Sequence, residues 1–294
     1  SMRFIDVHAH AVRKPFLQID GPAPFPTAEQ LIALYDFAGI EKAVLLPIIG
    51  PECYLPQSNE DILDMAARYP GRFIPFCNIH PRAISNRPDA PLSEVINKYK
   101  QAGCRGLGEV ICNMPFRDPF IRNLMKHVEL SGLPMTIHIA PRIDCTYGLY
   151  DDPGLPQLSE TLEMFPDLKI FGHSQAFWAE ISTMDKPEDR AGYPNYPIRK
   201  EGAVPKLMRR FPNLYGDLSA GSGCNALTRD PGYAVEFINE FQDRLMFGLD
   251  ICSPPSLETP KLMRFLLELH EKGSISEAVL SKVAYENAVR LLNI

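Results

Sequence analysis

Short apolar runs recur along the chain, and most of them are rich in β-branched or aromatic residues. Runs of about four to eight such residues, bounded by turn residues, are typical of buried β-strands. Eight runs fit this description and are predicted as strands, at residues 4–10, 42–48, 72–80, 104–110, 134–140, 168–174, 213–219 and 244–250.

Helical patterns lie between successive strands. Apolar residues at i, i+3 and i+4 spacing predict helices at residues 28–39, 58–69, 92–103, 120–132, 158–165, 203–211 and 233–241. Glycines such as Gly39 and prolines such as Pro70 end several of these helices before the next strand. Strands that alternate with helices need right-handed crossovers onto a parallel sheet. Eight such units around one core predict a closed (β/α)8 TIM barrel, with an open doubly wound sheet as the alternative.

We expect a single domain over residues 2–294, since Ser1 before Met2 is typical of an expression remnant. Two segments depart from the strand–helix rhythm. Residues 11–26 are rich in proline and follow the first strand, where a barrel places a substrate-facing loop. Residues 175–199 form the longest connection, and we interpret them as a lid or a subunit contact, which makes a homodimer plausible.

Composition narrows the classes of function. Hydrophobic residues make up 45% of the chain and charged residues 22%, as in globular proteins with a large core. The net charge of −6 argues against nucleic acid or a membrane as a partner, and no apolar stretch is long enough to span a bilayer. The seven cysteines form no C-x-x-C pair, which favours reduced thiols and a cytoplasmic location. Cys112 and Cys252 lack an adjacent base and are interpreted as small core residues rather than nucleophiles.

The first candidate functional residues lie at the end of the first predicted strand. His8 and His10 are two residues apart, so the period of a strand places both side chains on the same face. The pair is able to bind one cation, but two hydrogen-bonded core histidines would produce the same pattern. The rest of the sequence has to decide between these two interpretations.

Four further polar residues follow apolar runs at the ends of later strands: Glu109, His138, His173 and Asp250. Barrel active sites are built at this end of the strands, so these side chains are expected to meet His8 and His10. Burying carboxylates and imidazoles together is costly unless they are paired or bind a metal. Imidazole and carboxylate ligands without thiolate suit Zn, Mn, Fe or Ni, and zinc is the commonest choice for hydrolysis.

The placement of these residues resembles the amidohydrolase superfamily, which carries H-x-H on strand one, Glu on four, His on five and six, and Asp on eight. The local sequences FIDVHAH, IHIA, FGHSQAFW and FGLDI are similar to those of the amidohydrolase-related branch, the amidohydrolase 2 family, which includes hydrolases and decarboxylases. The sequences GLGEV and IHP also resemble TatD-like deoxyribonucleases, but the acidic net charge disfavours a nuclease.

The resemblance implies a mechanism. A cation held by the histidine pair of the first strand and Asp250 would activate a water, and Asp250 would carry its proton to the leaving group. If Glu109 bridges two cations, His138 and His173 hold the second one. If one cation binds, His138 completes its ligands and His173 becomes an acid, a base or an oxyanion-binding group. The sequence leaves one or two ions open.

The expected substrate is a small molecule. We predict a metal-dependent hydrolase of an amide, ester or lactone, with a non-oxidative decarboxylase of an unsaturated or aromatic acid as the alternative within the family. A catalytically silent barrel that serves binding or assembly is the alternative from another class. Six retained ligand candidates at the strand ends disfavour it.

Four residues near the strand ends are candidates for substrate contact. Arg142 can clamp a substrate carboxylate with its bidentate guanidinium, or form a surface salt bridge instead. Trp178 and Tyr54 lie in predicted mouth loops and are candidates for the cavity wall, although packing alone would also explain them. His80 ends the third strand before Pro81, and contact with substrate and a role in a turn are both open.

Other polar residues have simpler interpretations. His127 and His270 lie in helical, charge-flanked segments and are expected to face solvent. Asp6 precedes His8 on the same predicted face and is interpreted as a supporting hydrogen-bond partner. Asp217 ends the seventh strand and either supports a ligand or caps the loop that follows.

Overall fold

The computed structural model describes residues 2–18, 20–53, 55–144 and 147–294. Each of the eight predicted strands contains one observed strand, and a further two-residue strand, β6, follows the fifth. The strands are β1 (Ile5–Ala9), β2 (Lys42–Leu45), β3 (Phe73–Pro75), β4 (Leu107–Val110), β5 (Met135–Ala140), β6 (Leu149–Tyr150), β7 (Ile170–His173), β8 (Leu214–Asp217) and β9 (Leu245–Met246).

All strand pairings are parallel, in the orders β1-β2-β3 and β4-β5-β7-β8-β9, with β6 beside β5. Backbone hydrogen bonds join the two groups at both seams. The Cys77 N–H donates to the Gly106 carbonyl at 3.0 Å, after β3, and the Val7 N–H of β1 donates to the Phe247 carbonyl at 3.1 Å, after β9. The strands therefore form the predicted barrel.

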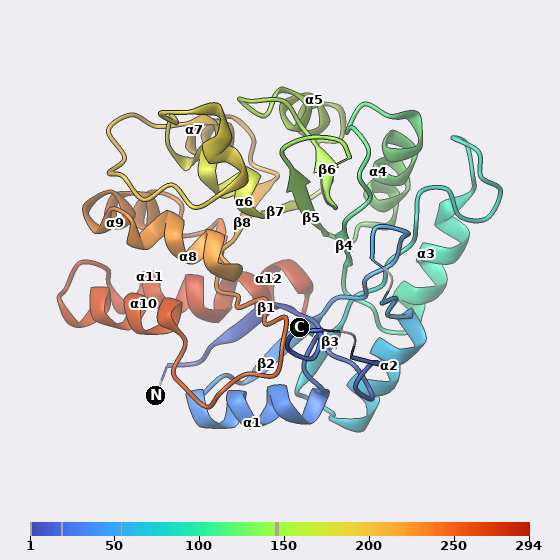
Figure 1. Ribbon diagram of the computed structural model, residues 1–294, viewed down its shortest axis with the longest axis horizontal. Coiled ribbons are helices and arrows are strands. Elements are labelled where there is room, and N and C mark those ends of the chain that lie inside the picture. Colours follow the sequence, from blue (N-terminus) through green and yellow to red (C-terminus); the bar gives the residue numbers. More distant parts are fainter. Residues whose placement is uncertain (1, 19, 54, 145–146) are drawn as a thin grey trace.

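Helices surround the strands, as Figure 1 shows. They are α1 (Ala28–Ala38), α2 (Asn59–Arg68), α3 (Leu92–Gln101), α4 (Pro119–Ser131), α5 (Pro156–Met164), α6 (Gln175–Trp178), α7 (Ala203–Arg210), α8 (Ala220–Thr228), α9 (Pro231–Glu240), α10 (Lys261–Glu271), α11 (Glu277–Ser281) and α12 (Asn287–Leu292). Three short non-α helices are η1 (Ala179–Ile181), η2 (Pro187–Ala191) and η3 (Lys282–Glu286).

Local sequence explains where α1 begins and ends. The Thr27 hydroxyl accepts a hydrogen bond from the Gln30 N–H at 3.2 Å, and the Gln30 side chain accepts one from the Thr27 N–H at 2.9 Å. This reciprocal capping box satisfies two backbone donors that the first turn leaves free. Gly39 ends the helix with a φ of 82°, a conformation that glycine adopts without steric cost.

The core has two layers because strand residues alternate between the faces of the barrel wall. One set, which includes Val7, Val44 and Phe171, packs together inside the barrel with residues of α12. The other set, which includes Leu45 and Ile137, packs against the surrounding helices. The wall is thereby held from both sides, and the strand ends are fixed relative to one another.

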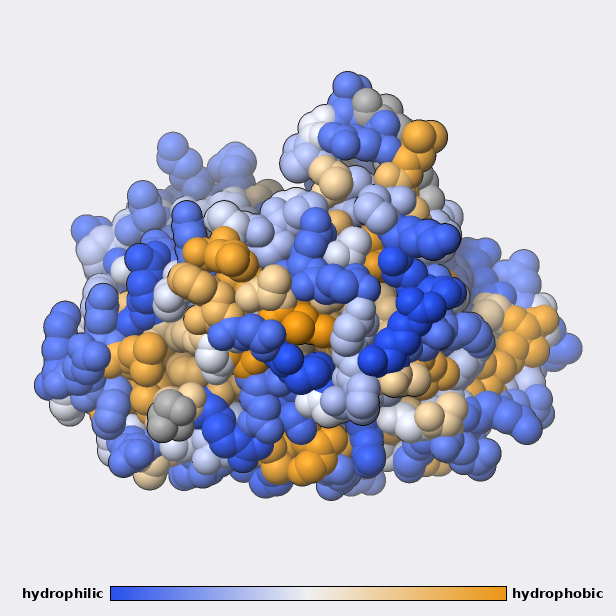
Figure 2. Space-filling view, turned by 90° about the horizontal axis from the view of Figure 1, so that it is seen from below, coloured by the Kyte–Doolittle hydropathy of each residue, from blue (hydrophilic) through white to orange (hydrophobic). Residues whose placement is uncertain are grey.

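The long connection after β7 folds over one edge of the barrel mouth. It consists of α6, η1 and η2 and an irregular segment that leads to α7. The surface on the face shown in Figure 2 carries small groups of apolar side chains among hydrophilic ones. Within the described part of the chain, no helix has both the length and the apolar character needed to cross a bilayer. Homodimer formation stays a prediction.

Candidate metal centre

The barrel brings the six predicted ligands into one cluster. They come from β1 (His8 and, directly after it, His10), β4 (Glu109), β5 (His138), β7 (His173) and the segment after β9 (Asp250). The four histidines and Glu109 are buried, and the Asp250 side chain is 13% exposed. Residues separated by up to 242 positions in the chain thus converge at the carboxyl ends of the strands.

Glu109 lies between two pairs of histidines. Its Oε1 is 3.2 Å from His8 Nε2 and 3.0 Å from His10 Nε2. Its Oε2 is 3.0 Å from His138 Nδ1 and 3.5 Å from His173 Nε2. One carboxylate therefore faces both histidine pairs, each with a different oxygen.

The two oxygens of the Asp250 carboxylate also face different histidines. Its Oδ1 lies 3.5 Å from Nε2 of both His8 and His10, whereas its Oδ2 lies 3.4 Å from His173 Nε2. Asp250 has a φ of 54°, and its N–H donates to the His8 carbonyl at 2.8 Å. This backbone hydrogen bond ties Asp250 to β1 and holds its carboxylate against the cluster.

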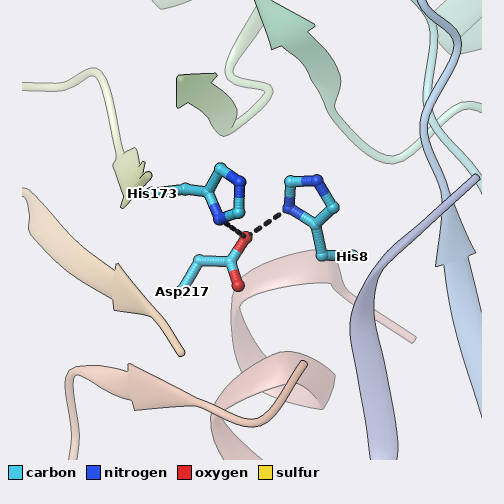
Figure 3. A group of neighbouring side chains, drawn as sticks. All are labelled: His8, His173 and Asp217. Atoms are coloured by element: carbon cyan, nitrogen blue, oxygen red, sulfur yellow. Dashed lines mark hydrogen bonds and ion pairs between the residues drawn. The ribbon is translucent and has the colours of Figure 1, made fainter. Parts of the chain in front are cut away.

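Three histidines are anchored through the ring nitrogen that faces away from the cluster. His8 Nδ1 lies 2.6 Å from Asp217 Oδ2, and His173 Nδ1 lies 2.9 Å from the Ser219 hydroxyl. His10 Nδ1 lies 2.9 Å from the Leu46 carbonyl. Figure 3 shows the rings of His8 and His173 on either side of the Asp217 carboxylate. Such partners fix the tautomer and leave Nε2 free to bind a metal.

The charged groups of the cluster shift one another's pKa values. Burial lowers the pKa of His8, but the charges of Asp250 and the neighbouring carboxylates outweigh it and hold that pKa well above its usual range. Burial raises the pKa of Asp250, but His8 and His173 outweigh it and lower that pKa to about 2. The Glu109 pKa is likewise well below its usual range, because the charge of His8 and hydrogen bonds from His10 and His138 outweigh burial. The histidines thus hold the pKa values of both carboxylates below their usual range despite burial.

These residues fit a divalent cation. Two groups of donor atoms, from His8, His10 and Asp250 and from Glu109, His138 and His173, each lie within 4.8 Å of one another. Imidazole nitrogen and carboxylate oxygen are ligands of zinc and related transition metals. A cation would also balance the buried negative charge, which is otherwise costly. The described residues therefore offer a candidate cation site at each histidine pair.

Asp217 supports the cluster by holding one of its histidines in place. It is fully buried, its Oδ1 accepts the Ser219 N–H at 2.9 Å, and its Oδ2 contacts His8. Asp217 therefore takes both roles that the sequence left open: it supports a candidate ligand, and it caps the loop that follows β8. Asp6 is a supporting hydrogen-bond partner, as predicted. Its Oδ1 accepts the His8 N–H at 3.0 Å and the Leu249 N–H at 2.9 Å, and its Oδ2 accepts the Tyr35 hydroxyl of α1 at 2.8 Å. The register of β1 shifts between Asp6 and Ala9, so Asp6 does not share the orientation of His8 and His10.

We expect Asp217→Asn to lower zinc affinity by about 10- to 100-fold, because the partner of a ligating histidine orients the ring and raises its basicity. Competition with a chromogenic chelator measures this affinity. Asp151→Asn is the matched control: Asp151 is equally buried, but its carboxylate accepts backbone N–H groups at the start of α5. Zinc affinity equal to that of the wild type in Asp217→Asn would contradict the anchoring role.

A cavity of about 650 Å³ opens beside the His138 side of the cluster. Arg142 lines it, and contact of Arg142 with substrate stays a prediction. Tyr147, Gln175 and Arg190 line it as well and are not among the residues predicted to contact substrate. Only their position after β5 and β7, where substrate loops are found in barrels, pointed to them.

The other candidates for substrate contact lie elsewhere. Trp178 belongs to α6 rather than to an open loop and is 1% exposed. Its Nε1 donates to the Asp217 carbonyl at 2.8 Å, so the ring packs in the core behind the cluster and does not line this cavity. His80 Nδ1 accepts the Arg82 N–H at 3.1 Å, which is the turn role. Tyr54 lies outside the described residues.

Gly148 controls the position of His138. Its φ is 117°, and a Cβ there would lie 2.7 Å from His138 Cδ2. We therefore expect Gly148→Ala to displace the His138 ring and to reduce bound metal, as measured by elemental analysis. Gly154→Ala is the matched control, since Gly154 has a φ of 89° but no atom within 4 Å of the added Cβ. The prediction fails if the two variants retain equal metal.

The comparison with known proteins identifies the family. The family model described as Amidohydrolase, the amidohydrolase 2 model, matches residues 5–294. The chain belongs to this family. Members are metal-dependent and act on small molecules, which agrees with the cluster and the adjacent cavity. A search of curated protein sequences found no match to this chain.

Solved structures share the fold of this amidohydrolase. A 5-carboxyvanillate decarboxylase from Sphingomonas paucimobilis has a TM-score of 0.63 at 19% identity, with 100% of each chain covered. A probable 2-pyrone-4,6-dicarboxylic acid hydrolase from Acinetobacter baumannii has a TM-score of 0.61 at 14% identity, also with 100% of each covered. A 2,6-dihydroxybenzoate decarboxylase from Rhizobium has a TM-score of 0.57 at 16% identity, covering 99% of this chain and 98% of that chain. At these identities the likeness shows the fold alone.

Proposed function

We propose that this amidohydrolase is a metal-dependent hydrolase of a small amide, ester or lactone. The observation that carries the proposal is the division of two carboxylates. Glu109 turns one oxygen to the His8–His10 pair and the other to His138 and His173, and Asp250 turns one oxygen to the His8–His10 pair and the other to His173. Two cations side by side are a recurring arrangement in hydrolytic enzymes. Zinc is the ion we propose, on the basis of the nitrogen and oxygen ligands.

His8, His10 and Asp250 would hold one ion and Glu109, His138 and His173 the other, with Glu109 shared. A divalent cation in such a site would lower the pKa of a bound water to about 7 and would polarise a substrate carbonyl. Asp250 is the proposed proton carrier, since its carboxylate is the most exposed of the six candidate ligands. It accepts the proton of the attacking water at a carboxylate oxygen and transfers it to the leaving group.

His173 would take a different role in the reaction if only one cation binds. Its Nε2 lies 3.4 Å from Asp250 Oδ2, and its Nδ1 is held by Ser219. With one cation bound on the His8 side, His173 would stand beside Asp250 as an acid, a base or a donor to the oxyanion. The number of ions bound per chain therefore decides which role His173 takes.

Decarboxylation is the second candidate reaction, and the residues that line the cavity favour keeping it as an alternative. Arg142 and His138 line the same cavity, so a substrate carboxylate could approach the cluster there. Two of the structures with this fold are named as decarboxylases of aromatic acids, and the third as a hydrolase of a dicarboxylic acid. We therefore propose that the substrate carries a carboxylate in either case.

A panel of carboxylated lactones, esters and amides together with hydroxybenzoic acids tests the proposal. The zinc-loaded protein is assayed for proton release at a fixed pH and for carbon dioxide in the same reactions. Hydrolysis of a lactone or ester releases a proton without carbon dioxide. Release of carbon dioxide with no consumption of water would replace the hydrolase proposal with the decarboxylase.

A further inference from the structure

The segment between β5 and β6 carries two residues of the cavity wall, Arg142 at one end and Tyr147 at the other. Asn113, which follows β4, holds both ends. Its Nδ2 donates to the Arg142 carbonyl at 3.2 Å and to the Gly148 carbonyl at 3.0 Å, and its Oδ1 accepts the Asp144 N–H at 2.8 Å. Three hydrogen bonds from one amide thus fix the segment at three points.

Asn113 is itself held in place. Its N–H donates to Glu52 Oε1 at 2.9 Å, and Glu52 belongs to the connection after β2. On its other side, the Gly148 N–H donates to the Ile111 carbonyl at 2.6 Å, and β6 pairs with the end of β5. The described residues of the segment are therefore tied to the connections after β2 and β4 and to the end of β5, so Tyr147, next to Gly148, has a defined position.

Tyr147 is positioned against a metal ligand by this arrangement. Its ring centroid lies 4.7 Å from that of His138, with an angle of 55° between the planes. Although it touches His138, Tyr147 is 43% exposed, and it lines the cavity. The close approach depends on Gly148, where a Cβ would lie 2.9 Å from the His138 carbonyl oxygen. An exposed aromatic ring fixed beside the cluster offers a flat surface to whatever occupies the cavity.

The remaining walls suit a planar ligand. Ile139, Pro141, Pro153 and Pro187 contribute apolar surface, and Arg142 contributes a cation. Aromatic rings prefer offset or edge-to-face contact with other planar π-systems. An anion that approaches Arg142 would therefore lie with its adjoining carbon skeleton beside the Tyr147 ring.

We propose that Tyr147 is a specificity-determining residue that packs against the planar part of a carboxylated substrate, and that Asn113 is its positioning residue. This inference rests on the proposed function, since it takes the cavity beside the cluster as the substrate site. It predicts a preference for a planar acid over a non-planar acid of equal charge and similar size.

The test uses the zinc-loaded protein with two probes, benzoate and cyclohexanecarboxylate, whose affinities are measured by calorimetry. We expect the wild type to prefer benzoate and Tyr147→Leu to reduce the ratio of the two affinities by about twofold to tenfold. Phe37→Leu is the matched control, because Phe37 is 56% exposed on α1 and does not line the cavity. It is expected to keep the wild-type ratio.

Asn113→Ala tests the positioning role. The Tyr147 ring is still present in this variant, so a reduced ratio with unchanged zinc content would show that its position matters. An unchanged ratio in Tyr147→Leu, no preference in the wild type, or no benzoate binding to the zinc-loaded wild type would each overturn the inference. Zinc content is measured in every sample, so failure of the metal site is distinguished from failure of the Tyr147 assignment.

Discussion

Replacing His8 and His10 together by alanine is expected to remove the metal of one half of the cluster. Both Nε2 atoms point at Glu109 Oε1 and Asp250 Oδ1, and no other histidine among the described residues contacts these two oxygens. If the wild type binds two ions, the double variant should retain one, held by Glu109, His138 and His173. Elemental analysis of protein purified without chelator measures the change in ions per chain.

The control for this variant removes two histidines outside the cluster. His127 contacts the Ser93 hydroxyl and His270 the Ile275 carbonyl, both on helices of the barrel exterior. His127→Ala with His270→Ala should therefore keep the wild-type metal content. Unchanged metal in the His8 and His10 variant would remove these residues from the metal site. Complete loss of metal would favour a single ion bound by all the histidines.

Asp250→Asn is expected to retain the fold and lose turnover. Asparagine is similar in size and keeps the backbone hydrogen bond to His8, but its amide does not accept a proton from water. Proton transfer by a positioned side chain contributes about 10²- to 10⁴-fold to a rate, and we expect a loss in kcat of that order. The substrate found in the panel, assayed at saturation, provides the measurement.

Two controls make the Asp250 result specific. Asp243→Asn removes a carboxylate from an exposed ion pair with Lys282 and should leave kcat unchanged. Metal content and thermal stability of Asp250→Asn separate a loss of chemistry from a loss of ligand or fold. Full turnover in Asp250→Asn would exclude it as the proton carrier and leave His173 as the nearest candidate.

The strand and helix pattern could be predicted from the sequence because it depends on local periodicity. Each buried strand is an apolar run between turn residues, and all eight runs contain an observed strand. The strand β6 was not predicted, since Leu149 and Tyr150 are too few to form a pattern and are a strand only through their pairing with Ile139 and Ala140 of β5. The supporting role of Asp6 was predicted, but its contact with Tyr35 of α1 was not, because it depends on a register shift within β1.

The convergence of the six candidate ligands could also be predicted, since strand ends in a barrel meet at one mouth whatever the loops do. Supporting and lining residues could not be predicted in this way. Trp178 packs in the core because α6 forms where a loop was expected, and Tyr147 reaches His138 because Asn113 and Gly148 shape its segment. These positions depend on contacts between distant segments.

The sequence by itself determined the barrel class, the order of its strands and six residues suited to a metal. Periodicity and the chemistry of the side chains are properties of the chain and need no coordinates. Only the tertiary structure decided that Glu109 divides its oxygens between two histidine pairs, that Asp250 faces the His8–His10 pair and His173, and that Asp217 supports His8. The physical reason is closure of the barrel: it sets distances between atoms on strands far apart in the chain, which local patterns do not specify.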